Sequence, residues 1–229
     1  MSLQVTDEEA IAALWDMDGV LVESAPFHFV AWQRTWAEMG LSVSEADFRK
    51  NFGQRNDTII HDMLGDDVSL EMIDSIGSKK EVYYRDAVKG HVEALPGAIE
   101  LLRALRADGF RCAIASAAPR ANVELILSEL GASSLFDALV SYEDVTRGKP
   151  DPQVYLLAAQ RVGVAPLRCL VLEDAVAGVD GAKAAGMACI AVTSTHPRRS
   201  LAKADLIVDS LADVTPATVR ALIGRRSHR

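Results

Sequence analysis

Cysteine is scarce in this sequence, which holds three, Cys112, Cys169 and Cys189, among 229 residues. Their number is odd, each lies inside an apolar run, and their spacing matches no metal motif. The pattern argues against a disulfide framework and against a cysteine-ligated metal. We expect buried, reduced thiols in a cytoplasmic protein.

Long hydrophobic runs are absent as well. No segment approaches the roughly 18 consecutive apolar residues that a membrane-spanning helix needs. The N-terminus has no basic stretch followed by an apolar one. We therefore expect neither a membrane partner nor a secretory signal.

Positive charge is in short supply, because 24 Lys and Arg residues face 32 Asp and Glu residues and the formal net charge is −8. Nucleic-acid binding depends on neutralising phosphates, so we expect no nucleic-acid partner. Apolar residues make up 49% of the chain, enough to bury a sizeable core. No apolar stripe is left over on this acidic surface, which favours a monomer.

Six short apolar runs are rich in Ile, Val, Leu, Ala and Cys and do not alternate with polar residues. This pattern is typical of strands buried on both faces. The runs are Ile11–Trp15, Cys112–Ala115, Ala138–Val140, Cys169–Leu172, Cys189–Val192 and Leu206–Val208.

Helical patterns separate these runs, and a glycine follows each apolar stripe as a C-terminal stop. The glycines are Gly109, Gly131 and Gly163. Strand and helix in alternation predict βαβ units. The expected fold class is α/β, with a Rossmann-like, doubly wound parallel sheet.

Residues 24–93 differ from the rest, because they contain no convincing strand. Phe29, Trp32 and Trp36 fall at helical spacing there. The α/β pattern resumes near Leu95-Pro96-Gly97. We predict an α/β core domain of residues 1–23 and 94–229, with a small α-helical domain of residues 24–93 inserted into it.

Polar residues follow several strands at the carboxyl end, where open parallel sheets bind ligands. They are Asp16 and Asp18 after the first run, Ser116 after the second, Lys149 in the loop after the third, and Glu173 and Asp174 after the fourth. Two like charges about 4 Å apart repel by ~4 kcal/mol at a moderate dielectric. Four carboxylates beside one lysine therefore predict a divalent cation. Mg²⁺ suits a phosphate substrate, because it shares phosphate oxygens.

The tetrapeptide Asp16-Met17-Asp18-Gly19 carries two acids at the end of a buried strand. Alternate side chains of an extended segment share a face. Asp16 is then placed to act as a nucleophile toward phosphorus and Asp18 as an acid and base. Acidic turns before glycine are common, so the tetrapeptide alone is also open to a structural interpretation.

Together with the later motifs, the pattern resembles the haloacid dehalogenase superfamily. Within it, the chain is similar to the β-phosphoglucomutase and phosphoglycolate phosphatase branch, which carries a helical cap. The matching segments are Asp16-Met17-Asp18-Gly19-Val20-Leu21, Ala115-Ser116-Ala117, Gly148-Lys149-Pro150-Asp151-Pro152 and Leu172-Glu173-Asp174-Ala175-Val176-Ala177-Gly178.

The resemblance implies a phosphatase mechanism. Asp16 would form an aspartyl-phosphate, while Asp18 would protonate the leaving oxygen and later activate water. Ser116 would bind a phosphoryl oxygen, and Lys149 would balance charge. The metal ligands would be Asp16, the backbone carbonyl of Asp18, Asp174, and Glu173 either directly or through water. An acid at Asp18 favours phosphate esters over the dehalogenase and phosphonate-cleaving branches.

The helical cap would set the specificity for a small phosphorylated metabolite. The resemblance assigns His28, Arg55 and Lys80 to substrate. A structural role for His28 at the junction of cap and core, and a solvated helix face for Lys80 beside Lys79, stay open as alternatives.

The turn after Ser116 favours hydrolysis over mutase activity. It continues as Ala117-Ala118-Pro119-Arg120, where the mutases have a more polar turn, and Glu23-Ser24 replaces an Asp-Thr pair. Ala117 and Arg120 remain candidate phosphate contacts. A β-phosphoglucomutase-type mutase is the alternative. A receiver-like signalling module and a degenerate binding relative are the non-enzymatic hypotheses. The helical insertion and the pairing of Asp18 with Asp16 argue against the first, and the presence of Asp16, Asp18, Lys149 and Asp174 argues against the second.

Overall fold

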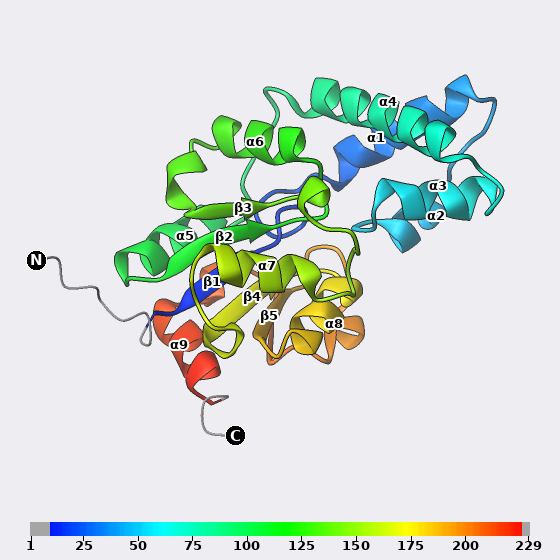
Figure 1. The fold of residues 1–229 in the computed structure, drawn as a ribbon. Coiled ribbons are helices and arrows are strands. Elements are labelled where there is room, and N and C mark those ends of the chain that lie inside the picture. Colours follow the sequence, from blue (N-terminus) through cyan, green and yellow to red (C-terminus); the bar gives the residue numbers. More distant parts are fainter. Residues whose placement is uncertain (1–9, 226–229) are drawn as a thin grey trace, which may run out of the picture.

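The computed structural model describes residues 10–225, and its centre is a parallel sheet of six strands in the order β3-β2-β1-β4-β5-β6 (Figure 1). The strands are β1 (Ala12–Trp15), β2 (Arg111–Ala115), β3 (Ala138–Val140), β4 (Cys169–Glu173), β5 (Ala188–Val192) and β6 (Leu206–Val208). Each predicted run forms one of them, with bounds that agree to within one residue. The predicted α/β fold class is confirmed.

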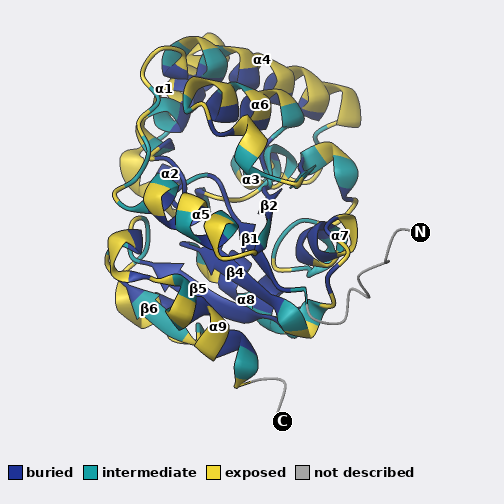
Figure 2. Ribbon diagram, turned by 90° about the vertical axis from the view of Figure 1, so that its left-hand side faces the viewer, coloured by how far each residue is buried: buried dark blue, intermediate teal, exposed yellow. Residues whose placement is uncertain are grey.

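Helices cover both faces of the sheet. The first face packs against α5 (Ala98–Ala107), α6 (Arg120–Glu129) and α9 (Pro216–Gly224), and the second against α7 (Gln153–Arg161) and α8 (Val176–Ala184). Strand residues alternate between the two cores: Ala13 and Trp15 enter the first, and Ala12 and Leu14 the second. Both sides are apolar, which explains the continuous hydrophobic runs. Figure 2 shows the central strands buried, whereas the edge strands β3 and β6 are only partly buried.

Short 3₁₀ helices complete the connections. They are η2 (Ser133–Leu135), η3 (Tyr142–Asp144), η4 (Pro166–Arg168), η5 (Arg198–Leu201) and η6 (Leu211–Asp213).

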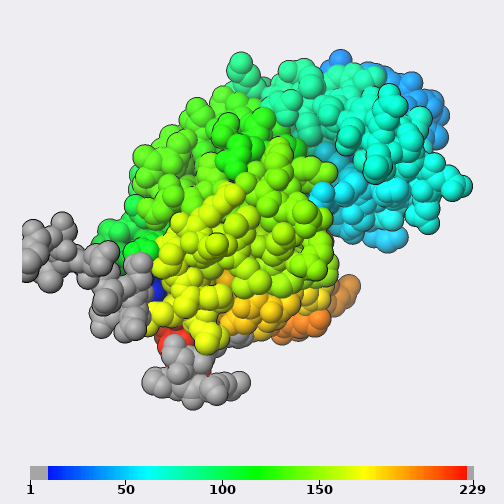
Figure 3. Space-filling model, in the orientation of Figure 1, coloured from blue at the N-terminus to red at the C-terminus, as the bar shows by residue number. Residues whose placement is uncertain are grey.

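Four helices stand between β1 and α5 and form a separate lobe (Figures 1 and 3). They are α1 (Ala25–Glu38), α2 (Glu45–Asn51), α3 (Asn56–Leu64) and α4 (Leu70–Val88). Serine side chains cap the N-termini of α2 and α4. The lobe has its own apolar cluster, built around Trp32, Trp36, Phe48 and Ile60. The insertion is helical, as the sequence predicts, whereas its boundaries as a domain stay a prediction.

The two chain segments that join this lobe to the sheet lie side by side. Val22 forms an antiparallel bridge with Ala94, and the Leu95 N–H donates to the Leu21 carbonyl at 2.9 Å. The three cysteines are buried and unpaired. Among residues 10–225, no helix has both the length and the apolar character that crossing a membrane requires.

Candidate active site

The candidate site lies at the carboxyl ends of three adjacent strands. β1 pairs with β2 on one side and β4 on the other, so that Trp15 is in register with both Ile114 and Leu172. The residues that follow these positions are therefore brought together. The Asp16 N–H extends the ladder to the Leu172 carbonyl at 3.0 Å.

Lys149 sits between two buried carboxylates. Its Nζ lies 2.9 Å from Asp16 Oδ1 and 2.6 Å from Glu173 Oε1. Burial raises the pKa of Asp16 to about 7, against the opposing charge of Lys149. Burial alone would lower the pKa of Lys149, but the two carboxylates outweigh it and raise that pKa. The lysine therefore stays charged and favours an ionised Asp16.

Glu173 has both carboxylate oxygens engaged. Oε1 accepts from Lys149 and from the Tyr155 hydroxyl at 2.7 Å, and Oε2 accepts from the backbone N–H groups of Asp174 and Ala175 at 2.8 and 2.9 Å. The carboxylate fits only because Gly178 lacks a side chain, since a Cβ there would lie 1.8 Å from Oε1. Glu173 therefore orients Lys149 and the turn after β4.

Asp174 is a buried carboxylate that lacks a hydrogen-bond partner for one oxygen within residues 10–225. It is 1% exposed, and its Oδ2 has no hydrogen-bond partner among the described residues. Burial and the nearby charges of Glu173 and Asp16 raise its pKa well above the ordinary value. Gly19, at φ +77°, lets the chain turn there, and a Cβ on it would lie 2.0 Å from Oδ2.

The donor set around Asp174 fits a divalent cation. One carboxylate oxygen from each of Asp16, Glu173 and Asp174 lies within 4.8 Å of the others. Three buried acids share one lysine, and hard oxygen donors are what Mg²⁺ binds. The orphaned Oδ2 would gain its missing partner from such an ion.

Ser116 lines the cavity and has a hydroxyl proton to donate. Its Oγ accepts the Ala118 N–H at 3.0 Å, which leaves the hydroxyl proton to donate elsewhere. Ala117 follows it along the cavity wall and has only backbone groups to offer for hydrogen bonding.

Asp18 faces the inserted helices. Its Oδ1 accepts a hydrogen bond from the Ser24 hydroxyl and lies 3.5 Å from His28 Nε2. Burial alone would raise the pKa of Asp18, but the contacts with His28 and Ser24 and the charge of Lys80 outweigh it and lower that pKa. A deprotonated Asp18 suits a group that takes a proton from water.

Lys80 is buried at 2% exposure, so the solvated-face interpretation of this residue is wrong. Helix α4 turns by 100° per residue, which leaves Lys79 exposed and aims Lys80 inward. Its Nζ lies 2.8 Å from His28 Nδ1 and donates to Glu81 Oε1 at 2.8 Å. His28 stacks on Tyr84 at 3.9 Å, and burial lowers its pKa.

Arg55 reaches from the insertion toward Ser116 and Lys149. Its guanidinium stacks on Tyr142 at 4.1 Å and pairs with Asp57 at 3.2 Å. It borders a small hollow together with Ser116 and Lys149, and its buried Nε has no partner among the described residues. The Arg55 Nε–H is thus a buried donor without a partner in residues 10–225, and it belongs to a residue that borders the same hollow as Ser116.

Arg120 is the predicted contact that the structure does not bring to the cavity. Its guanidinium pairs with Asp144 at 2.7 Å, and its backbone N–H donates to Glu143 at 3.0 Å. The expectation of a phosphate contact is corrected here, because Arg120 ties the start of α6 to η3.

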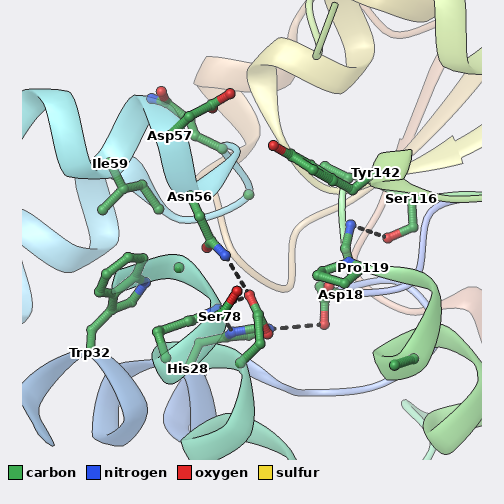
Figure 4. Close-up of a pocket in the computed structure, with 18 of the residues that line it drawn as sticks. Asp18, His28, Trp32, Asn56, Asp57, Ile59, Ser78, Ser116, Pro119 and Tyr142 are labelled. Carbon is green, nitrogen blue, oxygen red and sulfur yellow. Dashed lines mark hydrogen bonds and ion pairs between the residues drawn. The ribbon is translucent and has the colours of Figure 1, made fainter. Parts of the chain in front are cut away.

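A cavity of about 420 Å³ separates the strand ends from the inserted helices. Asp18, Ser116 and Tyr142 line its sheet side, and Trp32, Asn56 and Ile59 line the opposite wall (Figure 4). Three of the four predicted catalytic residues, Asp16, Asp18 and Ser116, therefore line one space with the helical insertion, and Lys149 borders the small hollow next to Ser116.

A family model described as "haloacid dehalogenase-like hydrolase" matches residues 12–186, from β1 to the turn after α8. The chain belongs to this family. The matched range takes in all of the predicted site residues, and the predicted membership is confirmed.

Two relatives of this haloacid dehalogenase-like hydrolase are phosphatases. Hexitol phosphatase A of Escherichia coli (strain K12) is 36% identical over 207 residues, which cover 88% of this chain and 92% of that protein. Validoxylamine A 7'-phosphate phosphatase of Streptomyces hygroscopicus subsp. limoneus is 32% identical over 202 residues, covering 88% and 94%. The prediction of an enzyme of this superfamily is confirmed.

A solved β-phosphoglucomutase from Clostridium difficile shares the fold. It matches with a TM-score of 0.85 at 24% identity, over 96% of this chain and 100% of that one. At this identity the likeness concerns the architecture of the hydrolase, a parallel sheet with helices on both faces.

Several residues around the site of this hydrolase lie outside the sequence motifs and were not predicted. Tyr155 contacts Glu173, and Asn56 and Asn122 contact Glu81, yet each comes from a helix far away in the sequence. The spacing of apolar residues gives no signal for such partners, because only the packing of the helices brings them together.

Proposed function

We propose that this protein is a Mg²⁺-dependent phosphatase that hydrolyses a small phosphorylated metabolite through an aspartyl-phosphate on Asp16. The observation that carries the proposal is the buried Asp16 carboxylate, held 2.9 Å from Lys149 and lining the cavity between the strand ends and the inserted helices. Aspartate is an established covalent nucleophile toward phosphorus.

The roles of the side chains follow from their surroundings. Lys149 favours the ionised form of Asp16 and neutralises charge on the phosphoryl group. The free proton of Ser116 and the spare Nε–H of Arg55 supply donors to phosphoryl oxygens. Asp18 takes up a proton as the phosphorylated substrate binds beside it, gives that proton to the leaving oxygen, and then takes one from the water that cleaves the intermediate.

The residues that would hold Mg²⁺ are Asp16, Asp174 and the backbone carbonyl of Asp18. When bound, the ion supplies positive charge to phosphoryl oxygens and offsets the crowded carboxylates. Glu173 is saturated by four hydrogen bonds, so we assign it to the support of Lys149 and not to direct ligation.

The cavity suits a hydroxylated carbon skeleton. Trp32, Phe52 and Ile59 give it apolar walls, while Asn56 and Ser78 place polar groups between them. Small-molecule sites combine these two kinds of lining. The names of the relatives, a hexitol phosphatase and a phosphatase of a phosphorylated validoxylamine, point the same way. We therefore expect a sugar or polyol phosphate.

The test is phosphate release from a panel of sugar, polyol and short-chain acid phosphates, with and without Mg²⁺. Asp16→Asn should abolish release, whereas Asp66→Asn, at an exposed turn, should leave it unchanged. Release that survives Asp16→Asn would refute the proposal. If the wild type releases little phosphate but isomerises a hexose 1-phosphate once primed with a bisphosphate, the mutase alternative holds. Action as a monomer and a cytoplasmic location remain predictions.

A further inference from the structure

Asn122 is a fully buried amide that joins the core to the inserted helices. It lies in the first turn of α6, shortly after Ser116, and is 0% exposed. Both ends of its side chain are used by helix α4. Oδ1 accepts from Arg85 Nη1 at 3.0 Å, and Nδ2 donates to Glu81 Oε2 at 2.5 Å.

Glu81 is the matching group on the inserted side. The residue is 5% exposed, and its second oxygen, Oε1, accepts from Asn56 Nδ2 at 2.7 Å and from Lys80 Nζ at 2.8 Å. One carboxylate thus collects donors from α3, α4 and α6. Losing one donor is costly for such a group, because a buried charge without its partners is not resolvated by water.

A chain of contacts leads from Glu81 to the proposed acid and base. Lys80 holds Glu81 on one side and His28 Nδ1 on the other, and His28 Nε2 lies 3.5 Å from Asp18 Oδ1 (Figure 4). His28 is clamped by stacking on Tyr84. The place of His28 over Asp18 therefore depends on where α4 lies.

Helix geometry separates the two tasks of α4. Glu81 and Arg85 are four residues apart and share a face, which meets Asn122 on α6. Lys80 and Tyr84 share the neighbouring face, which meets His28. A small rotation of the inserted helices away from α6 would break both bonds of Asn122 and shift Lys80 and His28 at once.

We propose that Asn122 and Glu81 are positioning residues, whose hydrogen bond holds α4 on α6 and so keeps Lys80 and His28 in place against Asp18. The kinetic part of this inference rests on the proposed function. The structural part concerns the unliganded protein and requires no substrate.

Swapping the amide of Asn122 and the carboxylate of Glu81 tests whether their hydrogen bond matters. Asn122→Asp sets two carboxylates against each other. Adding Glu81→Gln restores the pattern: the new amide donates to position 122, its oxygen accepts from Lys80 and Asn56, and Arg85 meets a carboxylate. Asn51→Asp, away from this cluster, is the matched control for the chemical change.

Backbone hydrogen exchange over α4 and α6 gives the readout that is independent of activity. We expect Asn122→Asp to speed exchange there at least tenfold, as the loss of a charged hydrogen bond implies, and the double variant to return to within about threefold of the wild type. Phosphate release should follow the same order, with kcat falling more than KM rises.

Either of two results would overturn the inference: unchanged exchange in Asn122→Asp, or a double variant no better than the single one. If Asn122→Asp fails to fold, Glu81→Gln alone takes its place as the single variant, because the new amide disturbs the contact between Asn122 and Arg85. The double variant must then still restore the protection of α4 and α6 against hydrogen exchange. If neither the wild type nor any variant releases phosphate, but hydrogen exchange changes as expected, the proposed function is rejected and the structural role of Asn122 and Glu81 stands.

Discussion

Single residues in this site are held by charge compensation. Lys149 is the clearest case, because it separates Asp16 from Glu173 and is the cation that contacts both. The pKa of each group follows from the others: burial would raise that of Glu173, yet Lys149 lowers it. Removing the lysine leaves two buried carboxylates face to face.

We predict that Lys149→Met lowers the free energy of unfolding by about 3 kcal/mol in metal-free buffer. Added Mg²⁺ should recover part of this loss, because a cation then faces the same carboxylates. Urea unfolding of the wild type and the variant, with and without Mg²⁺, measures both effects. An unchanged midpoint in metal-free buffer would contradict the assignment.

Gly178 gives a second prediction at this scale. Gly178→Ala should lower the free energy of unfolding by about 1–3 kcal/mol and impair phosphate release, because the added methyl group would overlap the Glu173 carboxylate. Gly77→Ala is the matched control, since it also lies inside a helix and its nearest neighbour is 3.6 Å away. Thermal unfolding of both variants separates the clash from helix propensity, which favours alanine in each case.

At the scale of secondary-structure elements, Asp144 ties three of them together. It caps η3 through Ser141 and pairs with Arg120 of α6 and Arg161 of α7. The hydrogen bond from Arg161, above all, lowers its pKa below the ordinary value of 3.8. A lowered pKa in the folded state contributes stability that is present above pH ~4 and is lost as the pH falls further.

We therefore expect Asp144→Asn to lower the free energy of unfolding by about 1–2 kcal/mol at pH 7. The difference from the wild type should shrink below pH ~4, because the Asp144 carboxylate takes up a proton in the unfolded state before it does so in the folded state. Chemical unfolding at pH 7 and pH 3, with Asp66→Asn as the exposed control, tests the sign. A difference that grows toward low pH would contradict it.

The strands and their ends could be predicted because a sheet covered on both faces leaves a local signature. β3 and β6 agree with the predicted runs at both ends, and Asp16, Ser116 and Glu173 follow from where strands end. The face of α4 could not be assigned in this way. Lys79 and Lys80 look alike in sequence, and only the packing of α4 on α1 decides which of them is buried.

At the scale of the whole molecule, the strand ends of the sheet supply the charged side of the cavity and the inserted helices supply the opposite side. The least satisfied group at the strand ends is Asp174, whose raised pKa reflects first its burial and then the charges of Glu173 and Asp16. Keeping it ionised without a cation costs stability, so metal binding and folding should be linked.

Asp174→Asn should therefore have opposite effects in two conditions. Without metal at pH 8, the variant should be as stable as the wild type or more stable, because a buried charge is removed. With Mg²⁺, the wild type should gain about 1.4–2.7 kcal/mol at 10–100 times the dissociation constant, and the variant should gain almost nothing. Calorimetric unfolding with and without Mg²⁺ measures this. An equal gain in both proteins would place the ion elsewhere.

Contacts across the cavity mark the limit of sequence reasoning at this scale. Asn122 and Glu81 are 41 residues apart and meet only after the insertion has folded back over α6. Arg120 shows the converse, because its place in a turn after Ser116 suggested substrate, whereas Asp144 engages it. Sequence motifs therefore predict which residues the strand ends bring together, but they do not predict side-chain contacts between helices of the core and helices of the insertion.

The central claim is that Asp16 carries the phosphoryl group. The most direct measurement is acid quenching of the enzyme during turnover of its best panel substrate, labelled in the phosphate, followed by peptide mapping. The account predicts label on the peptide that contains Asp16, none in Asp16→Asn, and full labelling in Asp66→Asn. Label on a different residue, or steady phosphate release from Asp16→Asn, would contradict it.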